Sequence, residues 1–151
     1  MLPPAHRQVL LYILQKLETF PYPWVVTGSG GLALQGMLLE VHDIDLQTGE
    51  PGAFEMERVL NGRRLIPVSY KSSERIHSFF GALELEGIKV EIMGDMQKRL
   101  PDGSWQAPVD IPAQRIWTPF ENKLVPVFSP TYELETYRLL GRAQRAAQIE
   151  V

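Results

Sequence analysis

Residues 24–38 change from a strand pattern to a helix pattern across a run of glycines, and this change constrains the fold more than any other feature. The segment "WVVTG" at 24–28 is rich in residues that favour strands, whereas "GGLALQGML" after it favours a helix. Glycine permits the tight turn that must join them. The sequence therefore predicts a strand, a glycine turn and a helix in this order.

Two other segments in the first half of the chain have helical signals. In residues 5–19, apolar side chains recur at helical spacing and form one stripe, at Val9, Leu10, Ile13, Leu14 and Leu17. Residues 53–62 predict a second helix, which Asn61 and Gly62 close. The glycine-containing stretch 48–52 between strand and helix predicts a turn or loop.

The second half of the chain predicts a helix after an irregular region. Residues 96–128 contain five prolines and two tryptophans and indicate short strands and loops. From Ser129 onward, with Pro130 as the first helical residue, the sequence predicts one last helix up to about residue 149. Its acidic residues come early and its arginines late, which is the order that the helix dipole favours.

Residues 79–95, "FFGALELEGIKVEIMGD", alternate apolar and polar side chains on both sides of Glu86-Gly87, which predicts a β-hairpin. In the second strand, Lys89, Glu91 and Met93 share one face, while the opposite face is apolar. Strands and helices in this order indicate the α/β (α+β) class.

Length and composition predict one ordinary globular domain over residues 1–151. A chain of 151 residues buries roughly 70% of the surface that its unfolded form exposes, so it folds without disulfides or a structural metal. Hydrophobic residues make up 44% and charged residues 22%, as in globular proteins generally. The chain has no cysteine, which excludes disulfides, thiol catalysis and cysteine-ligated metal sites.

The net charge and the length of the apolar runs indicate which partners and which cellular compartment to expect. No apolar run approaches the roughly 20 residues that a membrane span needs, and the beginning "MLPPAHRQ" has no signal-peptide pattern. We therefore expect a cytoplasmic protein without a membrane partner. A net charge of −3 gives no overall attraction to nucleic acid, so any phosphate must bind at a local basic cluster.

The motif "HDIDL" at 42–46 carries two aspartates in a strand-like run. Strand side chains alternate between faces, so Asp43 and Asp45 share one side, with Cα atoms roughly 6.5–7 Å apart. Aspartate is depleted in strands, and two close carboxylates repel each other. A divalent cation would offset this cost. On the motif alone, a pair of surface carboxylates on an edge strand is an equally good explanation.

Glu91 is the third carboxylate of interest. If its strand pairs beside the strand of Asp43 and Asp45, three hard oxygen ligands meet, and such ligands suit Mg²⁺ together with substrate phosphates. Taken singly, Glu91 is better explained as a partner of Lys89 or of a lysine on a neighbouring strand. Periodicity does not exclude other acids for the third position, namely Glu84, Glu86 and Asp95.

The glycine turn "TGSGG" at 27–31 joins a strand to a helix, where free N–H groups can bind an anion. Gly28 lets the backbone approach a phosphate closely, and the Ser29 hydroxyl adds a donor. Such turns also arise for purely conformational reasons, and the turn lacks the residues of a P-loop or of a dinucleotide fingerprint. By itself it is weak evidence of a site.

Three segments in order, "VVTGSGGLALQG", "VHDIDLQT" and "GIKVEIMGD", give the chain a resemblance to a known superfamily. Over roughly residues 22–145 it resembles the nucleotidyltransferases of the DNA polymerase beta type, especially small bacterial members. The resemblance implies the nucleotidyltransferase fold, a mixed central sheet flanked by helices. It also implies transfer of a nucleoside monophosphate from a nucleoside triphosphate (NTP) to an acceptor hydroxyl.

The resemblance also implies residue roles. Asp43, Asp45 and Glu91 would bind Mg²⁺ or Mn²⁺ and act in catalysis, with Glu91 as a ligand of the second ion or as the base that accepts the hydroxyl proton. Gly28 and Ser29 would bind the nucleotide phosphates. Arg142 would take the place of the lysine that many relatives carry on the last helix. The acceptor would be a small molecule, an RNA end or a protein side chain, as in similar families.

The chain departs from the superfamily pattern in several places. The "GSGG" run leaves open whether Gly28-Ser29 or Gly30-Gly31 is the turn, and the third acid is Glu instead of the commoner Asp. Helical spacing of Arg142 with two neighbouring arginines is explained equally well by a solvated basic face. A second hypothesis is therefore a binding or regulatory module with little or no catalysis, such as an antitoxin-like partner of a toxin-like protein.

Overall fold

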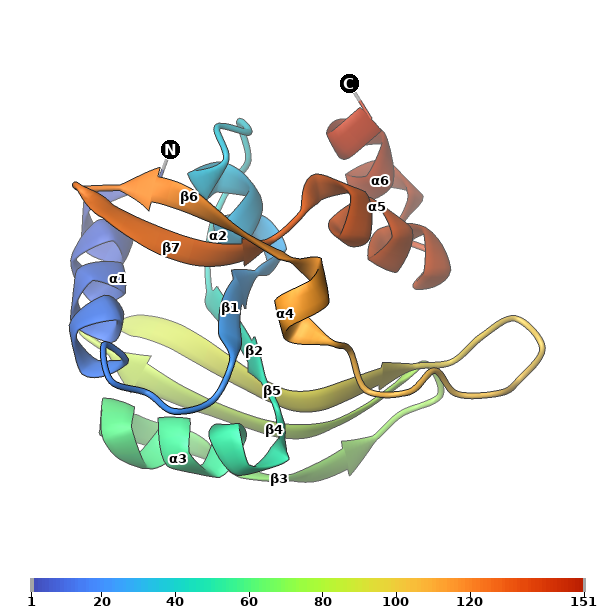
Figure 1. Ribbon diagram of the computed structural model, residues 1–151, viewed down its shortest axis with the longest axis horizontal. Coiled ribbons are helices and arrows are strands. Elements are labelled where there is room, and N and C mark those ends of the chain that lie inside the picture. Colours follow the sequence, from blue (N-terminus) through green and yellow to red (C-terminus); the bar gives the residue numbers. More distant parts are fainter. Residues whose placement is uncertain (1, 151) are drawn as a thin grey trace.

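The computed structural model describes residues 2–150, which form six helices and seven strands in one mixed sheet (Figure 1). The strand order is β3-β4-β5-β2-β1-β7-β6. The strands are β1 (Trp24–Thr27), β2 (Ile44–Thr48), β3 (Arg63–Ser72), β4 (Ile76–Leu85), β5 (Ile88–Lys98), β6 (Arg115–Phe120) and β7 (Lys123–Phe128). The helices are α1 (Pro4–Lys16), α2 (Gly28–Leu34), α3 (Glu50–Leu60), α4 (Ile111–Gln114), α5 (Pro130–Leu139) and α6 (Ala143–Glu150).

The centre of the sheet is built from β1, β2 and β5. Strand β2 runs antiparallel to β1 and parallel to β5, and β7 lies parallel to β1 on its other side. This combination of parallel and antiparallel neighbours confirms the predicted mixed sheet with flanking helices. The transition from β1 through Gly28 into α2 was predicted, although α2 ends at Leu34, four residues earlier than expected.

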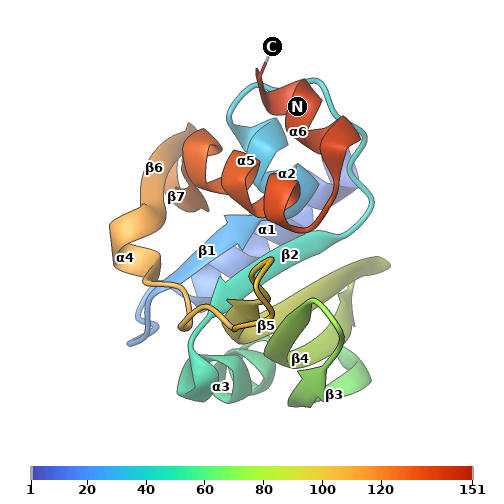
Figure 2. The same ribbon diagram turned by 90° about the vertical axis from the view of Figure 1, so that its right-hand side faces the viewer.

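The two faces of the central strands differ in chemistry. Ile44, Leu46 and Ile92 point to the face that packs with α1 and α3 in the main hydrophobic core. Thr27 and the acidic side chains point to the other face, where α5 and α6 lie on the same side of β2 as α2 (Figure 2). The acidic side chains of the central strands thus lie on the face that α2, α5 and α6 cover.

The hairpin of β4 and β5 turns at Glu86 and Gly87, both with positive φ, as the alternation predicted. Further along, β5 contains a bulge: two residues, Asp95 and Met96, oppose a single residue of β4, and Asp95 has φ +48°. A bulge changes which face the following side chains occupy. Beyond it, Lys98 contacts side chains of α5.

The prediction of a single last helix is wrong, because two helices, α5 and α6, form there. Ser129 does cap α5, but the chain turns at Gly141 with φ +73° before α6 begins. The N–H of Arg142 bonds the carbonyl of Tyr137, and the N–H of Gly141 bonds that of Arg138. This is a Schellman motif, which ends a helix at glycine. Arg138, Arg142 and Arg145 therefore do not share one helical face.

Two other differences concern the middle of the chain. Helix α3 begins at Glu50 with Pro51 in its first turn, so part of the predicted loop is helical. Its end at Leu60, with Asn61 in the left-handed region, agrees with the predicted closure. Strand β3 was not predicted, because most of its side chains are exposed and it has no buried face to set a periodicity.

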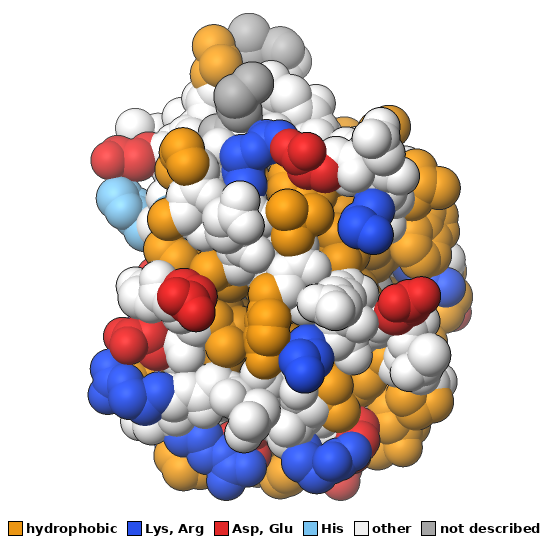
Figure 3. Space-filling model, turned by 90° about the vertical axis from the view of Figure 1, so that its left-hand side faces the viewer, with side chains coloured by type: hydrophobic (Ala, Val, Ile, Leu, Met, Phe, Trp, Pro, Cys, Tyr) orange, Lys and Arg blue, Asp and Glu red, His pale blue; other side chains and the backbone are white. Residues whose placement is uncertain are grey.

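On the side that carries α1, hydrophobic side chains are mixed with charged ones, and lysine and arginine side chains gather at the lower edge of the view (Figure 3). Between residues 2 and 150, none of the helices has the length and apolar character that a membrane crossing requires.

Candidate active site

The parallel pairing of β2 with β5 places Asp45 directly beside Glu91, and the antiparallel pairing with β1 places Thr27 on its other side. Asp43 lies just before β2 begins. The Lys89 ammonium is 4.0 Å from the Asp43 carboxylate, so the positive charge of this lysine lies beside the acidic residues. The structure thus brings the three acids named from the sequence to one point of the sheet.

Burial is the main reason that Asp45 and Glu91 have a raised pKa. Burial raises the pKa of Asp45 to about 7, and the charges of Glu91 and Asp43 add to the rise. Burial also raises the pKa of Glu91, an effect that the positive charge of Lys89 opposes. The buried Oδ1 of Asp45 has no hydrogen-bond partner. Negative charge at this point is costly, so a cation or donor from a ligand would be stabilising here.

The donor set fits a hard divalent cation. Within the described residues, no three His, Cys, Asp or Glu side chains form a ready-made metal cage. Mg²⁺, however, characteristically takes one or two protein carboxylates and completes its coordination with water and substrate phosphates. Asp43, Asp45 and Glu91 supply only carboxylate oxygens, one of them unpartnered and buried. These residues therefore fit Mg²⁺ or Mn²⁺ that arrives with a phosphate ligand.

The glycine turn lies against this cluster. Gly28 has φ +67°, and a Cβ at this position would clash with the Asp45 carboxylate. Gly31 packs closely on the carbonyl of Val26, where a Cβ would lie 2.8 Å away. Gly28 therefore makes the turn itself, and Gly31 lets α2 pack on β1. This assignment settles the register of the glycine run that the sequence left open.

Two cavities meet at Gly28 and Asp45. The larger, of about 870 Å³, is also lined by Ser29 and by the arginines Arg142 and Arg145. The smaller, of about 190 Å³, lies between the sheet and α5. Its lining includes Gln47, Glu91, Met93, Glu133 and Arg142. Arg142 lines both cavities, whereas Arg145 lines only the larger of the two.

Several polar residues of the site were not identified from the sequence. Glu133 in α5 is only 3% exposed, and its carboxylate accepts a 2.5 Å hydrogen bond from the Thr27 hydroxyl. Burial raises the pKa of Glu133 to about 7. Buried Gln47 has an unpartnered Oε1. An acid in a first helical turn is normally explained by the helix dipole, so nothing local indicated that Glu133 points inward.

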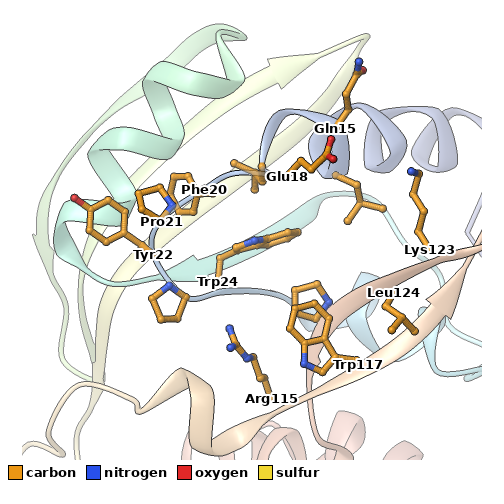
Figure 4. A pocket seen from close by; sticks show the side chains of 14 residues that line it. Gln15, Glu18, Phe20, Pro21, Tyr22, Trp24, Arg115, Trp117, Lys123 and Leu124 are labelled. Carbon is orange, nitrogen blue, oxygen red and sulfur yellow. The ribbon is translucent and has the colours of Figure 1, made fainter.

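A separate cavity of about 590 Å³ lies at the end of β1 away from the carboxylates. Trp24 stands at its centre, with Tyr22 and Phe20 on one side and Trp117 and Arg115 on the other (Figure 4). Trp24 points to the opposite face of the sheet from Thr27. Aromatic and proline side chains dominate this cavity, and it is not continuous with the acidic site.

The fold and the acidic site define a protein of the nucleotidyltransferase fold. The structure resembles TM1012 of Thermotoga maritima, a candidate nucleotidyltransferase, with a TM-score of 0.89 and 44% sequence identity over 99% of this chain and 93% of that chain. Residues 9–150 match the family model of aminoglycoside-2''-adenylyltransferases, and the chain belongs to this family. A comparison with curated proteins found no significant match.

Two antibiotic-modifying enzymes share the fold at low sequence identity. The lincosamide antibiotic adenylyltransferase LnuA, in its lincomycin-bound structure, matches with a TM-score of 0.59 and 18% identity over 85% of this chain and 83% of that chain. ANT(2'')-Ia in complex with adenylyl-2''-tobramycin matches with a TM-score of 0.57 and 15% identity over 97% of this chain and 93% of that chain. At these identities, the likeness concerns the fold alone.

Proposed function

We propose that the protein transfers a nucleoside monophosphate from an NTP to an acceptor hydroxyl and releases pyrophosphate. The observation that supports this most strongly is the register of β2 on β5, which sets Asp45 beside Glu91 and next to the Gly28 turn. Neither motif alone distinguishes a site from a solvated surface. Their convergence at the junction of two cavities supports phosphoryl chemistry.

In this proposal, Asp43 and Asp45, with Glu91, hold Mg²⁺ or Mn²⁺. The ion, when bound, neutralises negative charge on the phosphates. The Ser29 hydroxyl and the turn amides bind the outer phosphates, and Arg142 adds a positive charge from the start of α6. The larger cavity, with its two arginines, takes the triphosphate.

Glu91 is proposed as the base. Its carboxylate accepts the proton of the acceptor hydroxyl as the hydroxyl oxygen attacks the α-phosphorus. A bond forms between that oxygen and phosphorus, and the bond between phosphorus and the α–β bridging oxygen breaks, so pyrophosphate leaves. A raised pKa suits this role, because a more basic carboxylate takes up the proton more readily.

Labelled NTPs test the proposal directly. The purified protein is incubated with each α-labelled NTP, Mg²⁺ or Mn²⁺, and candidate acceptors, beginning with tobramycin and lincomycin because these are the antibiotics of the two fold relatives. We expect label on the acceptor with wild type, and at least a hundredfold loss with Asp43→Asn and Asp45→Asn. Asp102→Asn, an exposed acid in the loop after β5, is the matched control and should retain transfer.

The outcomes separate the enzyme from a binding module. Transfer that persists in folded Asp45→Asn would contradict the proposed roles. Saturable NTP binding without transfer to any acceptor, including RNA ends and proteins, would favour the regulatory module. Co-purification with a toxin-like protein would then identify the partner class. If calorimetry detects uptake of neither NTP nor cation, both hypotheses fail.

A further inference from the structure

Glu133 is a buried acid that the proposed chemistry does not use. Its side chain comes from the first turn of α5 and reaches the sheet across 106 positions of sequence to accept the hydrogen bond from Thr27. Only 3% of the residue is exposed. Placing a carboxylate in such surroundings is unfavourable unless donors compensate it. The donors it finds therefore indicate what it does.

Both donors to Glu133 belong to the segment that enters the glycine turn. The Thr27 hydroxyl, at the end of β1, donates a hydrogen bond, and the backbone N–H of Gly28 lies near enough to the same carboxylate to lower its pKa. These are the two residues that come immediately before Ser29. Gly28 also has the left-handed backbone angle that directs the chain into α2. One carboxylate thus holds both sides of the peptide at which the turn begins.

The other neighbours of Glu133 keep this carboxylate in place. Lys98 and Arg145 supply positive charge that opposes the effect of burial on the Glu133 pKa. The Lys98 ammonium is itself fixed, because it donates to the Tyr132 hydroxyl at 2.7 Å and to the Thr136 hydroxyl at 2.9 Å. The bulge in β5 precedes Lys98 by two residues. Hydrogen bonds therefore connect Lys98 of β5 to α5, and Glu133 of α5 to Thr27 at the start of the glycine turn.

From this geometry we infer that Glu133 is a positioning residue for nucleotide binding, which holds the Thr27–Gly28 peptide so that Ser29 and the amides after it face the triphosphate. The inference rests on the proposed function. In this arrangement the Gly28 N–H faces the protein's own carboxylate, while the Ser29 hydroxyl and the next N–H groups are left for phosphate. Glu133 itself does not contact the substrate.

Three variants test this inference. Glu133→Ala removes the acceptor, Glu133→Gln keeps an oxygen that can accept from both donors, and Thr27→Val removes one donor at nearly constant shape. Glu135→Gln is the matched control, because it makes the same charge change on the exposed side of the same helix. For each variant, circular dichroism checks folding, and calorimetry measures the affinities for Mn²⁺ alone and for ATP with Mn²⁺. Hydrogen exchange of the Gly28 amide is followed in the ligand-free protein.

We expect Glu133→Ala to weaken ATP binding by roughly tenfold to a hundredfold, as the loss of charge-assisted hydrogen bonds implies. Thr27→Val should weaken it about threefold to tenfold, and Glu133→Gln and Glu135→Gln by less than about threefold. Mn²⁺ affinity should stay within about threefold of wild type in all four. Exchange of the Gly28 amide should accelerate at least about tenfold in Glu133→Ala only.

Equal weakening of Mn²⁺ and ATP in the variants would overturn the inference, because Glu133 would then support the whole site instead of the turn. Unchanged ATP affinity in Thr27→Val and Glu133→Ala would also overturn it. If Glu133→Ala fails to fold, Thr27→Val and Glu133→Gln decide the outcome. If wild type binds no ATP, the other NTPs replace it in the same titrations, and binding of none of them refutes the proposed function. Unchanged Gly28 exchange separately refutes the role of Glu133.

Discussion

Replacing Asp45 with asparagine should stabilise the ligand-free protein while removing its activity. The folded protein holds a proton on Asp45 up to a pKa of about 7, whereas the unfolded chain releases it near 3.8. Stability from this group is therefore fully present below pH 3.8 and is lost as the pH rises through 7. At about 1.4 kcal/mol per pKa unit, the cost of the charged carboxylate at pH 8.5 is at most about 4 kcal/mol.

We expect Asp45→Asn to raise the free energy of unfolding at pH 8.5 by about 2–4 kcal/mol, because the amide avoids the charge and can donate to Glu91. For a chain of this length, this corresponds to a rise in Tm of roughly 4–16 °C. At pH 4 the two proteins should differ by less than about 1 kcal/mol. Urea unfolding at both pH values, followed by circular dichroism, measures the difference.

Asp43→Asn is the control, since Asp43 is partly exposed and lies 4.0 Å from Lys89. Its substitution should change stability by less than about 1 kcal/mol at either pH. Two results would refute the reasoning: an Asp45→Asn protein that is no more stable than wild type at pH 8.5, or a gain that is equally large at pH 4. Either would mean that Asp45 does not carry an unfavourable charge in the folded protein.

Three further predictions concern the turn, the arginine and the ligand. Gly28→Ala should destabilise the protein by about 1–3 kcal/mol in thermal unfolding, because a Cβ at this positive φ clashes with Asp45. Gly36→Ala, also at positive φ but in open space, should cost less stability, and equal losses in the two variants would contradict this explanation. Arg142→Ala should weaken NTP binding about threefold to tenfold in calorimetry, with Tm almost unchanged. Arg138→Ala, the control, loses an ion pair with Glu150 and should bind NTP as wild type does. In a thermal shift assay, Mn²⁺ together with NTP at about 100 times Kd should stabilise wild type by about 2.7 kcal/mol and should leave Asp45→Asn unstabilised. An equal shift in both proteins would argue against Asp45 as a metal ligand.

Local patterns explain why the sequence predicted the hairpin and the central strands correctly. Alternation with a period of two assigns each side chain to a face, so Glu91 could be separated from the apolar residues beside it. The turn at Glu86-Gly87 and the glycine entry into α2 likewise depend on nearby residues. The break at Gly141 was also present in the sequence, as a glycine after two leucines, but helical spacing of the arginines suggested a continuous helix.

The bulge in β5 and the outward β3 were not predictable in the same way. Asp95 adopts φ +48° because β5 must pair with β4 on both sides of an extra residue, and no residue type there requires it. Strand β3 exists because β4 offers it an edge to pair with. Both are consequences of strand pairing, which depends on the neighbouring strand and not on the segment's own pattern.

The sequence by itself determined which residues share a strand face, that a glycine run joins a strand to a helix, and which acids are candidates for binding a cation. Only the tertiary structure decided that Asp45 would be buried enough to raise its pKa to about 7, and that Glu133 would reach Thr27 from 106 positions away. The reason is physical: the cost of a charge depends on the solvent and donors around it. Those surroundings exist only once α5 has packed over the sheet.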